Sequence, residues 1–140
     1  TATLRDIEWM QDDAPNLDHV LSEYVGDHLD SLRWMRAGKG LRVCRLRAAA
    51  NDRMWLLRAE PGTVLPKHSH TSSELTLVLK GAYESQGSLF RIGDIEDADD
   101  TVEHQPLVAD GEECICLAAL EDKLRFSGFL PKLVQPLIGI

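Results

Sequence analysis

Two histidines and one glutamate lie within seven residues of one another in this 140-residue chain, at spacings that suit a metal ion. His68 and His70 are two residues apart, so in an extended strand their side chains project from the same face. Glu74 follows a small polar turn, Thr71–Ser73, that can bring its carboxylate to the same point. A third histidine, His104, comes after a further turn and can enter from a different strand.

Neutral imidazoles and a carboxylate are typical ligands of a divalent transition metal. His68, His70, Glu74 and His104 are therefore candidate ligands of one metal ion. Zinc is favoured because three imidazoles and one carboxylate complete a tetrahedral set, and iron, manganese, nickel or copper are the alternatives. The absence of thiolates at these positions argues against a structural zinc finger.

The elements that must position these ligands are mostly β-strands. Short runs rich in Val, Leu, Trp and Ile, separated by turn residues, are typical of a β-sandwich or barrel. Before them, apolar residues recur at helical spacing after Asn16, a plausible N-cap, and predict an amphipathic helix that ends near Leu32. A short C-terminal helix is predicted over residues 130–137. The predicted strands are Leu41–Leu46, Met54–Ala59, Leu75–Lys80, Ala82–Ser85, Leu89–Ile92 and Cys114–Leu120.

The composition is that of one folded globular domain. Hydrophobic residues make up 44% and charged residues 27% of the chain, which is enough to bury a core. A formal net charge of −8 repels phosphate backbones, so no direct nucleic-acid binding is expected. The apolar runs, such as Ile115–Leu120, are far shorter than the roughly 20 residues of a membrane span, so no membrane partner is expected either.

The cysteines and the N-terminus indicate the compartment. Three is an odd number, and Cys114 and Cys116 stand two apart in an apolar run, a poor layout for a secreted disulfide framework. We therefore expect a reducing cytoplasm. The chain opens at Thr1 without an apolar leader, so we expect a processed protein or part of a longer one.

Two stretches of the sequence resemble the conserved motifs of the cupin superfamily. From Gly62 to Gly81 the order is glycine, five residues, His-x-His, three residues, Glu, six residues and glycine. The stretch from Gly87 to His104 resembles the second motif in outline, although Ile92 stands where proline is usual. The resemblance implies an all-β cupin fold, a double-stranded β-helix or jelly-roll-like barrel over residues 34–140, after an N-terminal helical segment over residues 1–33. It also implies the ligand set His68, His70, Glu74 and His104.

A narrower resemblance covers residues 29–140. Four segments are similar to the cupin-like C-terminal domain of ChrR-type anti-sigma factors: Leu29–Trp34, Glu60–Thr71, Glu74–Tyr83 and Gln135–Ile140. In that family the cupin-like domain is needed to respond to oxidative stress, and a separate N-terminal domain with a His and Cys zinc motif holds the sigma factor. No such motif precedes His68. The resemblance therefore implies a sensory module, with a sigma factor as partner only through a domain absent from this chain.

These residues and the resemblance together leave two classes of function. The favoured one is a regulatory metal-binding module of the ChrR type. The alternative is a small metalloenzyme such as a non-haem iron dioxygenase that cleaves a ketone or diketone. No catalytic residue can be assigned, because Lys67 and Glu103 merely flank ligands and Tyr83, Glu84 and Cys44 cannot be placed from the sequence.

Several polar residues are interpreted as structural. His19 and His28 lie on the predicted helix among acidic residues and are expected at the surface. Cys114 and Cys116 are expected to be buried, inert thiols of a core strand. The acidic residues Asp94, Glu96, Asp97, Asp99, Asp100 and Glu103 are expected to form a solvated loop. A homodimer is expected, with the segment around Trp9 and the helix Leu17–Leu29 at the interface.

Overall fold

The computed structural model describes residues 29–46, 53–121 and 125–126. The chain divides into two compact units after Leu32, and the fold below is that of the unit Arg33–Ile140. In the other unit, Leu29–Ser31 forms the short 3-10 helix η1. Most of the predicted N-terminal helix, all of the predicted C-terminal helix, and Trp9, His19 and His28 lie outside the described residues. The described helical residues form no segment long and apolar enough to cross a membrane.

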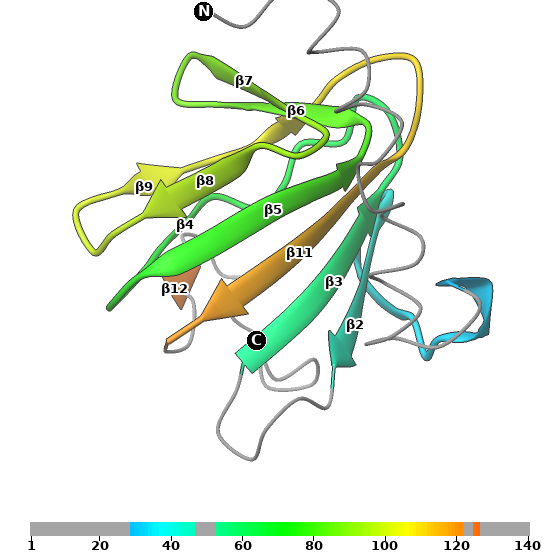
Figure 1. Cartoon of the computed structure of the whole chain (residues 1–140), viewed down its shortest axis with the longest axis horizontal. Helices are drawn as coiled ribbons and strands as arrows, with labels where there is room; N and C mark the ends of the chain where they lie inside the picture. The colour runs from blue at the N-terminus through cyan, green and yellow to red at the C-terminus, as the bar shows by residue number, and fades with distance from the viewer. Residues whose placement is uncertain (1–28, 47–52, 122–124, 127–140) are drawn as a thin grey trace, which may run out of the picture. The chain divides into compact units, whose positions relative to one another are not determined.

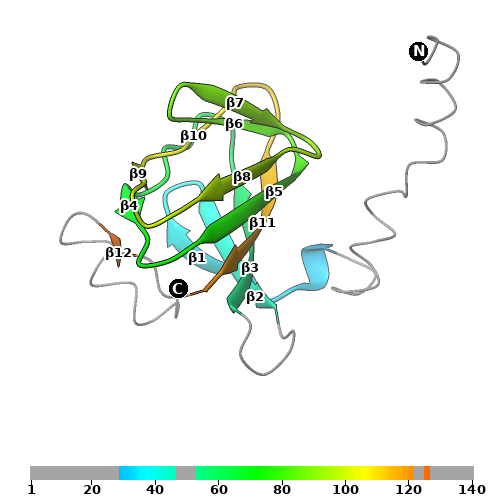
Figure 2. The same ribbon diagram turned by 60° about the vertical axis from the view of Figure 1, so that its left-hand side comes forward.

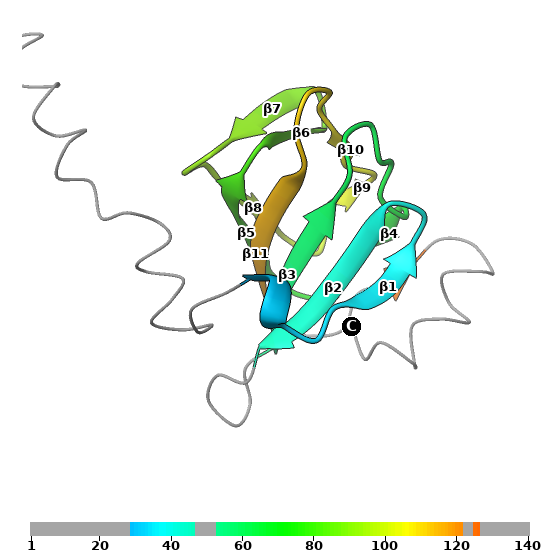
Figure 3. The same ribbon diagram turned by 90° about the vertical axis from the view of Figure 1, so that its right-hand side faces the viewer.

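Six strands of the described residues form a large antiparallel sheet in the order β1-β2-β3-β11-β5-β8. Figure 1 shows β5, β11, β3 and β2 side by side in this sheet, and Figure 3 shows the β1–β2 hairpin beside β3. The bounds are β1 Met35–Gly38, β2 Leu41–Leu46, β3 Arg53–Ala59, β11 Cys114–Leu120, β5 Glu74–Lys80 and β8 Ile95–Ala98.

Short strands in two further sheets close the barrel opposite the large sheet. One has the order β10-β6-β7, with β10 at Leu107–Val108, β6 at Ala82–Ser85 and β7 at Ser88–Arg91. The other has the order β12-β4-β9, with β12 at Arg125–Phe126, β4 at His68–Ser69 and β9 at Glu103–His104. Figure 2 shows β4, β9 and β10 across the interior from β3 and β11. The predicted all-β barrel is therefore confirmed.

The core lies between these layers. Trp55, Leu56, Val43 and Val78 are the largest side chains that are less than 2% exposed. Burial of each such side chain contributes about 1.5–3 kcal/mol. Trp55 lies on the interior face of β3, and Leu56 lies on the opposite face because side chains alternate along a strand. Both side chains are buried. Burial on both faces explains why β3 and β11 are nearly continuous apolar runs in the sequence.

The predicted strands agree closely with those observed. Leu41–Leu46, Ala82–Ser85 and Cys114–Leu120 have the predicted bounds, and the other three predicted strands differ by one residue at one or both ends. β1 and the two-residue strands β4, β9, β10 and β12 were not predicted, because runs this short carry almost no periodic signal.

One prediction about the acidic segment is wrong. Ile95–Ala98 is not a solvated loop but the edge strand β8, paired with β5. Glu96 and Ala98 are buried while Ile95 and Asp97 are exposed. The alternation of the strand therefore turns the carboxylate of Glu96 inward and the isoleucine outward, opposite to their polarities. The remaining acidic residues of the segment are exposed, as predicted.

Gly81 fixes the passage from β5 to β6 and explains the last glycine of the first cupin-like motif. Its φ is +70°, a left-handed backbone conformation that residues other than glycine rarely adopt. A Cβ at this position would also collide with the carbonyl oxygen of Glu113, just before β11. Gly81 thus lets two chain segments approach one another at the end of the barrel.

We predict that Gly81→Ala lowers the free energy of unfolding by at least about 3 kcal/mol, because conformational strain and a backbone clash add together. Gly87→Ala is the matched control, since Gly87 has a φ of +76° but a Cβ added there would meet nothing within 4 Å. It should cost about 1 kcal/mol, from the positive φ alone. Urea denaturation measures both, and equal losses would contradict the close approach.

Candidate metal centre

The pairing of β4 with β9 brings two of the predicted ligands together. His68 and His104 are direct cross-strand partners in this antiparallel pair. His70 follows β4 immediately, and Glu74 is the first residue of β5 after the polar turn. The two-residue spacing of the histidines places both side chains inside the barrel, as the sequence predicted.

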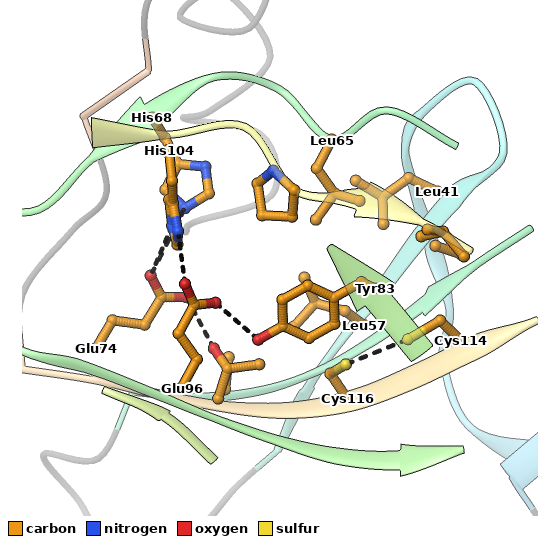
Figure 4. Close-up of a pocket in the computed structure, with 15 residues that line it drawn as sticks. Leu41, Leu57, Leu65, His68, Glu74, Tyr83, Glu96, His104, Cys114 and Cys116 are labelled. Atoms are coloured by element: carbon orange, nitrogen blue, oxygen red, sulfur yellow. Dashed lines mark hydrogen bonds and ion pairs between the residues drawn. The ribbon is translucent and has the colours of Figure 1, made fainter. Parts of the chain in front are cut away.

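The four side chains meet at one buried point. His68, His70, Glu74 and His104 are each only 5–6% exposed. One possible ligand atom from each lies within 4.8 Å of all the others. The Nε2 atoms of His68 and His104 are 2.9 Å apart, and they lie 3.6 and 3.8 Å from Oε2 of Glu74. Figure 4 shows His68 and His104 directed at Glu74.

Each imidazole is oriented by a hydrogen bond from its other nitrogen. Nδ1 of His68 donates to the carbonyl oxygen of Pro66 at 2.8 Å, and Nδ1 of His70 faces that of Asp99 at 3.4 Å. Nδ1 of His104 lies 3.2 Å from Oε1 of Glu96. Carbonyl and carboxylate oxygens only accept hydrogen bonds, so Nδ1 carries the proton and each Nε2 turns a lone pair toward the shared point.

This arrangement fits a cation. Nε2 of His70 and Oε2 of Glu74 contact each other, yet neither has a hydrogen-bond partner. Two acceptors in contact repel one another in a buried site, as do two Nε2 lone pairs only 2.9 Å apart. A positive charge among them removes both conflicts, so these four residues could hold a metal ion.

The pKa values of Glu74 and His104 also indicate that this site favours a positive charge. Burial raises the pKa of Glu74, but the imidazoles of His104, His68 and His70 outweigh it and hold that pKa well below its ordinary value. Burial lowers the pKa of His104, but Glu74 and Glu96 outweigh it and raise that pKa to about 9. The site thus favours an ionised carboxylate with positive charge beside it.

Glu96 is a buried partner of the candidate ligand His104 that the sequence analysis missed. Its Oε1 accepts hydrogen bonds from Ser85 Oγ at 2.7 Å and from His104 Nδ1 at 3.2 Å, and its Oε2 accepts one from the Tyr83 hydroxyl at 2.7 Å. Burial raises the pKa of Glu96, but the hydrogen bonds from His104, Ser85 and Tyr83 outweigh it and lower that pKa. Glu96 is therefore an ionised carboxylate that orients His104. The available signal was that Glu96 and Ala98 are two residues apart, so in a strand their side chains lie on the same face.

Comparison with known proteins places the chain in a family. Residues 23–123 match the family model described as the ChrR cupin-like domain. The chain belongs to this family. It is 44% identical over 126 residues to the anti-sigma-E factor ChrR of Cereibacter sphaeroides. The alignment covers 90% of this chain but 59% of that protein, so the chain spans a little over half the length of this relative.

Solved structures give the same family and fold. The crystal structure of Rhodobacter sphaeroides SigE in complex with the anti-sigma ChrR matches with a TM-score of 0.71 at 36% identity, over 86% of this chain and 67% of that one. A sugar phosphate isomerase of the cupin superfamily from Silicibacter pomeroyi matches with a TM-score of 0.62 at 22% identity, over 73% and 81% of the two chains. The second match shows the fold alone. The predicted cupin fold and ChrR-type resemblance are confirmed.

The ChrR-type barrel contains a small cavity beside the four candidate ligands. Its volume is about 50 Å³, and His68, Glu74 and His104 form part of its wall. Most of the remaining wall is apolar and includes Leu57 and Val108. The Tyr83 ring also lines the cavity and extends its hydroxyl to Glu96 (Figure 4). Burial and the neighbouring Glu96 raise the pKa of Tyr83, so it remains a neutral donor.

The other residues considered from the sequence lie around the candidate metal centre rather than in it. Lys67 and Glu103 form an exposed ion pair of 2.7 Å that links the two ligand strands. Glu84 is exposed, and Cys44 is buried on β2. Cys114 and Cys116 are free and buried, as predicted, and both line the cavity.

We predict that Glu96→Gln weakens metal binding about 10- to 100-fold, because an amide cannot orient His104 as an ionised carboxylate does. Asp97→Asn is the matched control, since Asp97 is the next residue on β8 and is exposed. Competition of each variant against a chromophoric chelator gives the affinities. Equal affinity of Glu96→Gln and Asp97→Asn would contradict the role assigned to Glu96.

Proposed function

We propose that this chain is the metal-holding sensory part of a ChrR-type anti-sigma regulator. The observation that carries the proposal is the convergence of three imidazole Nε2 atoms and one carboxylate on a buried point, where Nε2 of His70 and Oε2 of Glu74 have no hydrogen-bond partner. Membership of the ChrR cupin-like domain family supports a regulatory rather than an enzymatic role.

The ion that we propose for this site is zinc, held by His68, His70, Glu74 and His104. These side chains supply three imidazole nitrogens and one carboxylate oxygen, which suit a four-coordinate zinc ion. When bound, the ion would cross-link β4, β5 and β9. Iron, manganese and nickel are the alternatives, because the same donor types also suit them.

The signal and the partner that we propose come from the ChrR relatives. One relative is described as an anti-sigma-E factor, and one matching structure contains SigE with ChrR. We propose that this chain responds to oxidative stress and influences a sigma factor through a part of the regulator outside this chain. A sigma factor works with cytoplasmic RNA polymerase, so the cytoplasm is the proposed location.

The assembly that we propose has two further parts. The barrel begins near residue 34, after an N-terminal segment over residues 1–33. Two copies form a homodimer, for which light scattering of the purified chain is the measurement. The exposed edge strand β8 gives the barrel a reason to associate, because unpaired strand edges tend to be covered.

The dioxygenase alternative is not proposed. A cavity of about 50 Å³ has room for about two water molecules at about 30 Å³ each, which is less than a ketone or diketone substrate needs. Oxygen uptake by the metal-loaded chain with small ketones would reverse this choice.

We predict that the purified chain carries close to one equivalent of a transition metal and that replacing His68 and His70 by alanine removes most of it. The reason is that two of four ligands are lost. Glu103→Gln is the control, because Glu103 neighbours His104 but is exposed. Elemental analysis gives the metal content and its identity. Unchanged content in the double variant would refute the site.

We also predict that loss of the ion loosens the strands that it cross-links. Hydrogen exchange should rise in residues 75–79 and 102–107 when the ion is removed by a chelator, because β5 and β9 are then no longer joined through it. Singlet oxygen treatment should have the same effect if the centre is the sensor. Exchange in β2 serves as the internal reference. Identical hydrogen exchange around both segments in the loaded, chelated and oxidised protein would refute a metal-centred sensor. That result would leave the separate prediction of metal binding, which elemental analysis tests, unchanged.

A further inference from the structure

Cys114 and Cys116 form a close pair of thiols at the opposite end of the cavity from the histidines. They project from the same face of β11, and their sulfur atoms are 3.5 Å apart. Each is nearly buried, at 3% and 6% exposed, and each lines the cavity. Figure 4 shows the ring of Tyr83 between this pair and the metal centre. The pair is therefore a separate feature of the interior.

The backbone does not favour a disulfide between these residues. β11 pairs with β3 in unbroken register, with Cys114 opposite Ala59 and Cys116 opposite Leu57. Two residues of a regular strand have Cα atoms about 6.6 Å apart, at the wide end of the range for disulfides. The sulfurs would have to close from 3.5 Å to about 2.05 Å within the centre of a sheet.

A single atom bound to both sulfurs needs no such movement. Two bonds of about 2.3 Å, the length of a zinc–thiolate bond, span about 3.8 Å at a tetrahedral angle. At the narrower angle of a pyramidal three-coordinate atom they span about 3.5 Å, by the same arithmetic. The observed separation therefore fits a pyramidal atom that prefers sulfur.

The surroundings select among such atoms. The described lining of the cavity offers no third thiol, and its wall near the pair is apolar. A divalent metal ion would lack ligands there, and a charged adduct would be costly to bury. A trivalent metalloid that carries its own apolar substituent forms a neutral adduct with two sulfurs and needs no further ligand from the protein.

We propose that Cys114 and Cys116 form a binding site for small trivalent organoarsenicals, as a class of soft metalloid compounds. With methylarsonous acid, CH3As(OH)2, two S–H bonds and two As–O bonds break, two As–S bonds form, and two water molecules leave. No atom changes its oxidation state. The hydrogen bond between the two thiols lowers the pKa of Cys114, so Cys114 is the sulfur that attacks first.

The cavity also sets a limit on size. A volume of about 50 Å³ accommodates a methyl group beside the arsenic atom but not a phenyl ring without repacking of the core. We therefore expect methylarsonous acid to react with the folded protein and phenylarsonous acid to react with it only after denaturation.

The experiment treats the intact chain with methylarsonous acid and measures its mass under native conditions. The expected product gains one CH3As group and loses two hydrogens. Titration of the thiols after denaturation should then find one reactive thiol, that of Cys44, instead of three. A competing small dithiol should restore all three.

Single variants assign the adduct. Cys44→Ser should retain it, and Cys114→Ser and Cys116→Ser should each lose the doubly bonded product. If a variant fails to fold, the thiol count on the treated chain without substitutions still tests the proposal. The proposal is overturned if the native chain forms no adduct, if two thiols remain reactive, or if phenylarsonous acid reacts with the native chain equally fast. None of these readouts depends on the proposed metal centre.

Discussion

The structure depends on one constraint, which is that four polar groups are forced together in an apolar interior. The register of β4 against β9 places His68 opposite His104, and the turn into β5 adds Glu74. Their inward atoms are acceptors, because each Nδ1 proton already faces an outer oxygen atom. Such a cluster is unfavourable without positive charge and strongly cross-linking with it. The short strands β4 and β9, with few hydrogen bonds of their own, therefore gain most from an ion.

This constraint explains why the cluster is predictable from the sequence. The spacing of His68, His70 and Glu74 is a local property of a strand and a turn, so it can be recognised without the tertiary structure. The long strands β2, β3, β5 and β11 were also predicted to within one residue, because their apolar residues extend over six or seven positions. His104 required the family resemblance, since a long acidic segment separates it from the other ligands.

Glu96 was missed for a physical reason. Among five other acidic residues it reads as part of a solvated segment, and hydrophobicity would turn Ile95 inward instead. The partners that stabilise a carboxylate inside the barrel are Tyr83 and Ser85 on β6 and His104 on β9. None of these contacts is local, so the composition of the segment alone gives the opposite answer. The proximity of the Cys114 and Cys116 sulfurs is likewise a matter of rotamers, which the sequence does not determine.

Charge balance connects these observations. A divalent ion at the shared point would be neutralised by two buried carboxylates, Glu74 as a ligand and Glu96 through the imidazole of His104. Without Glu96 the occupied interior would carry one net positive charge, which a low-polarity core tolerates poorly. Without the ion, the same two carboxylates raise the pKa of His104 to about 9, so a proton replaces part of the missing charge. That proton can lie between Nε2 of His104 and Nε2 of His68, but it leaves Nε2 of His70 against Oε2 of Glu74. One proton thus resolves one of the two conflicts, whereas an ion at the centre of all four groups resolves both.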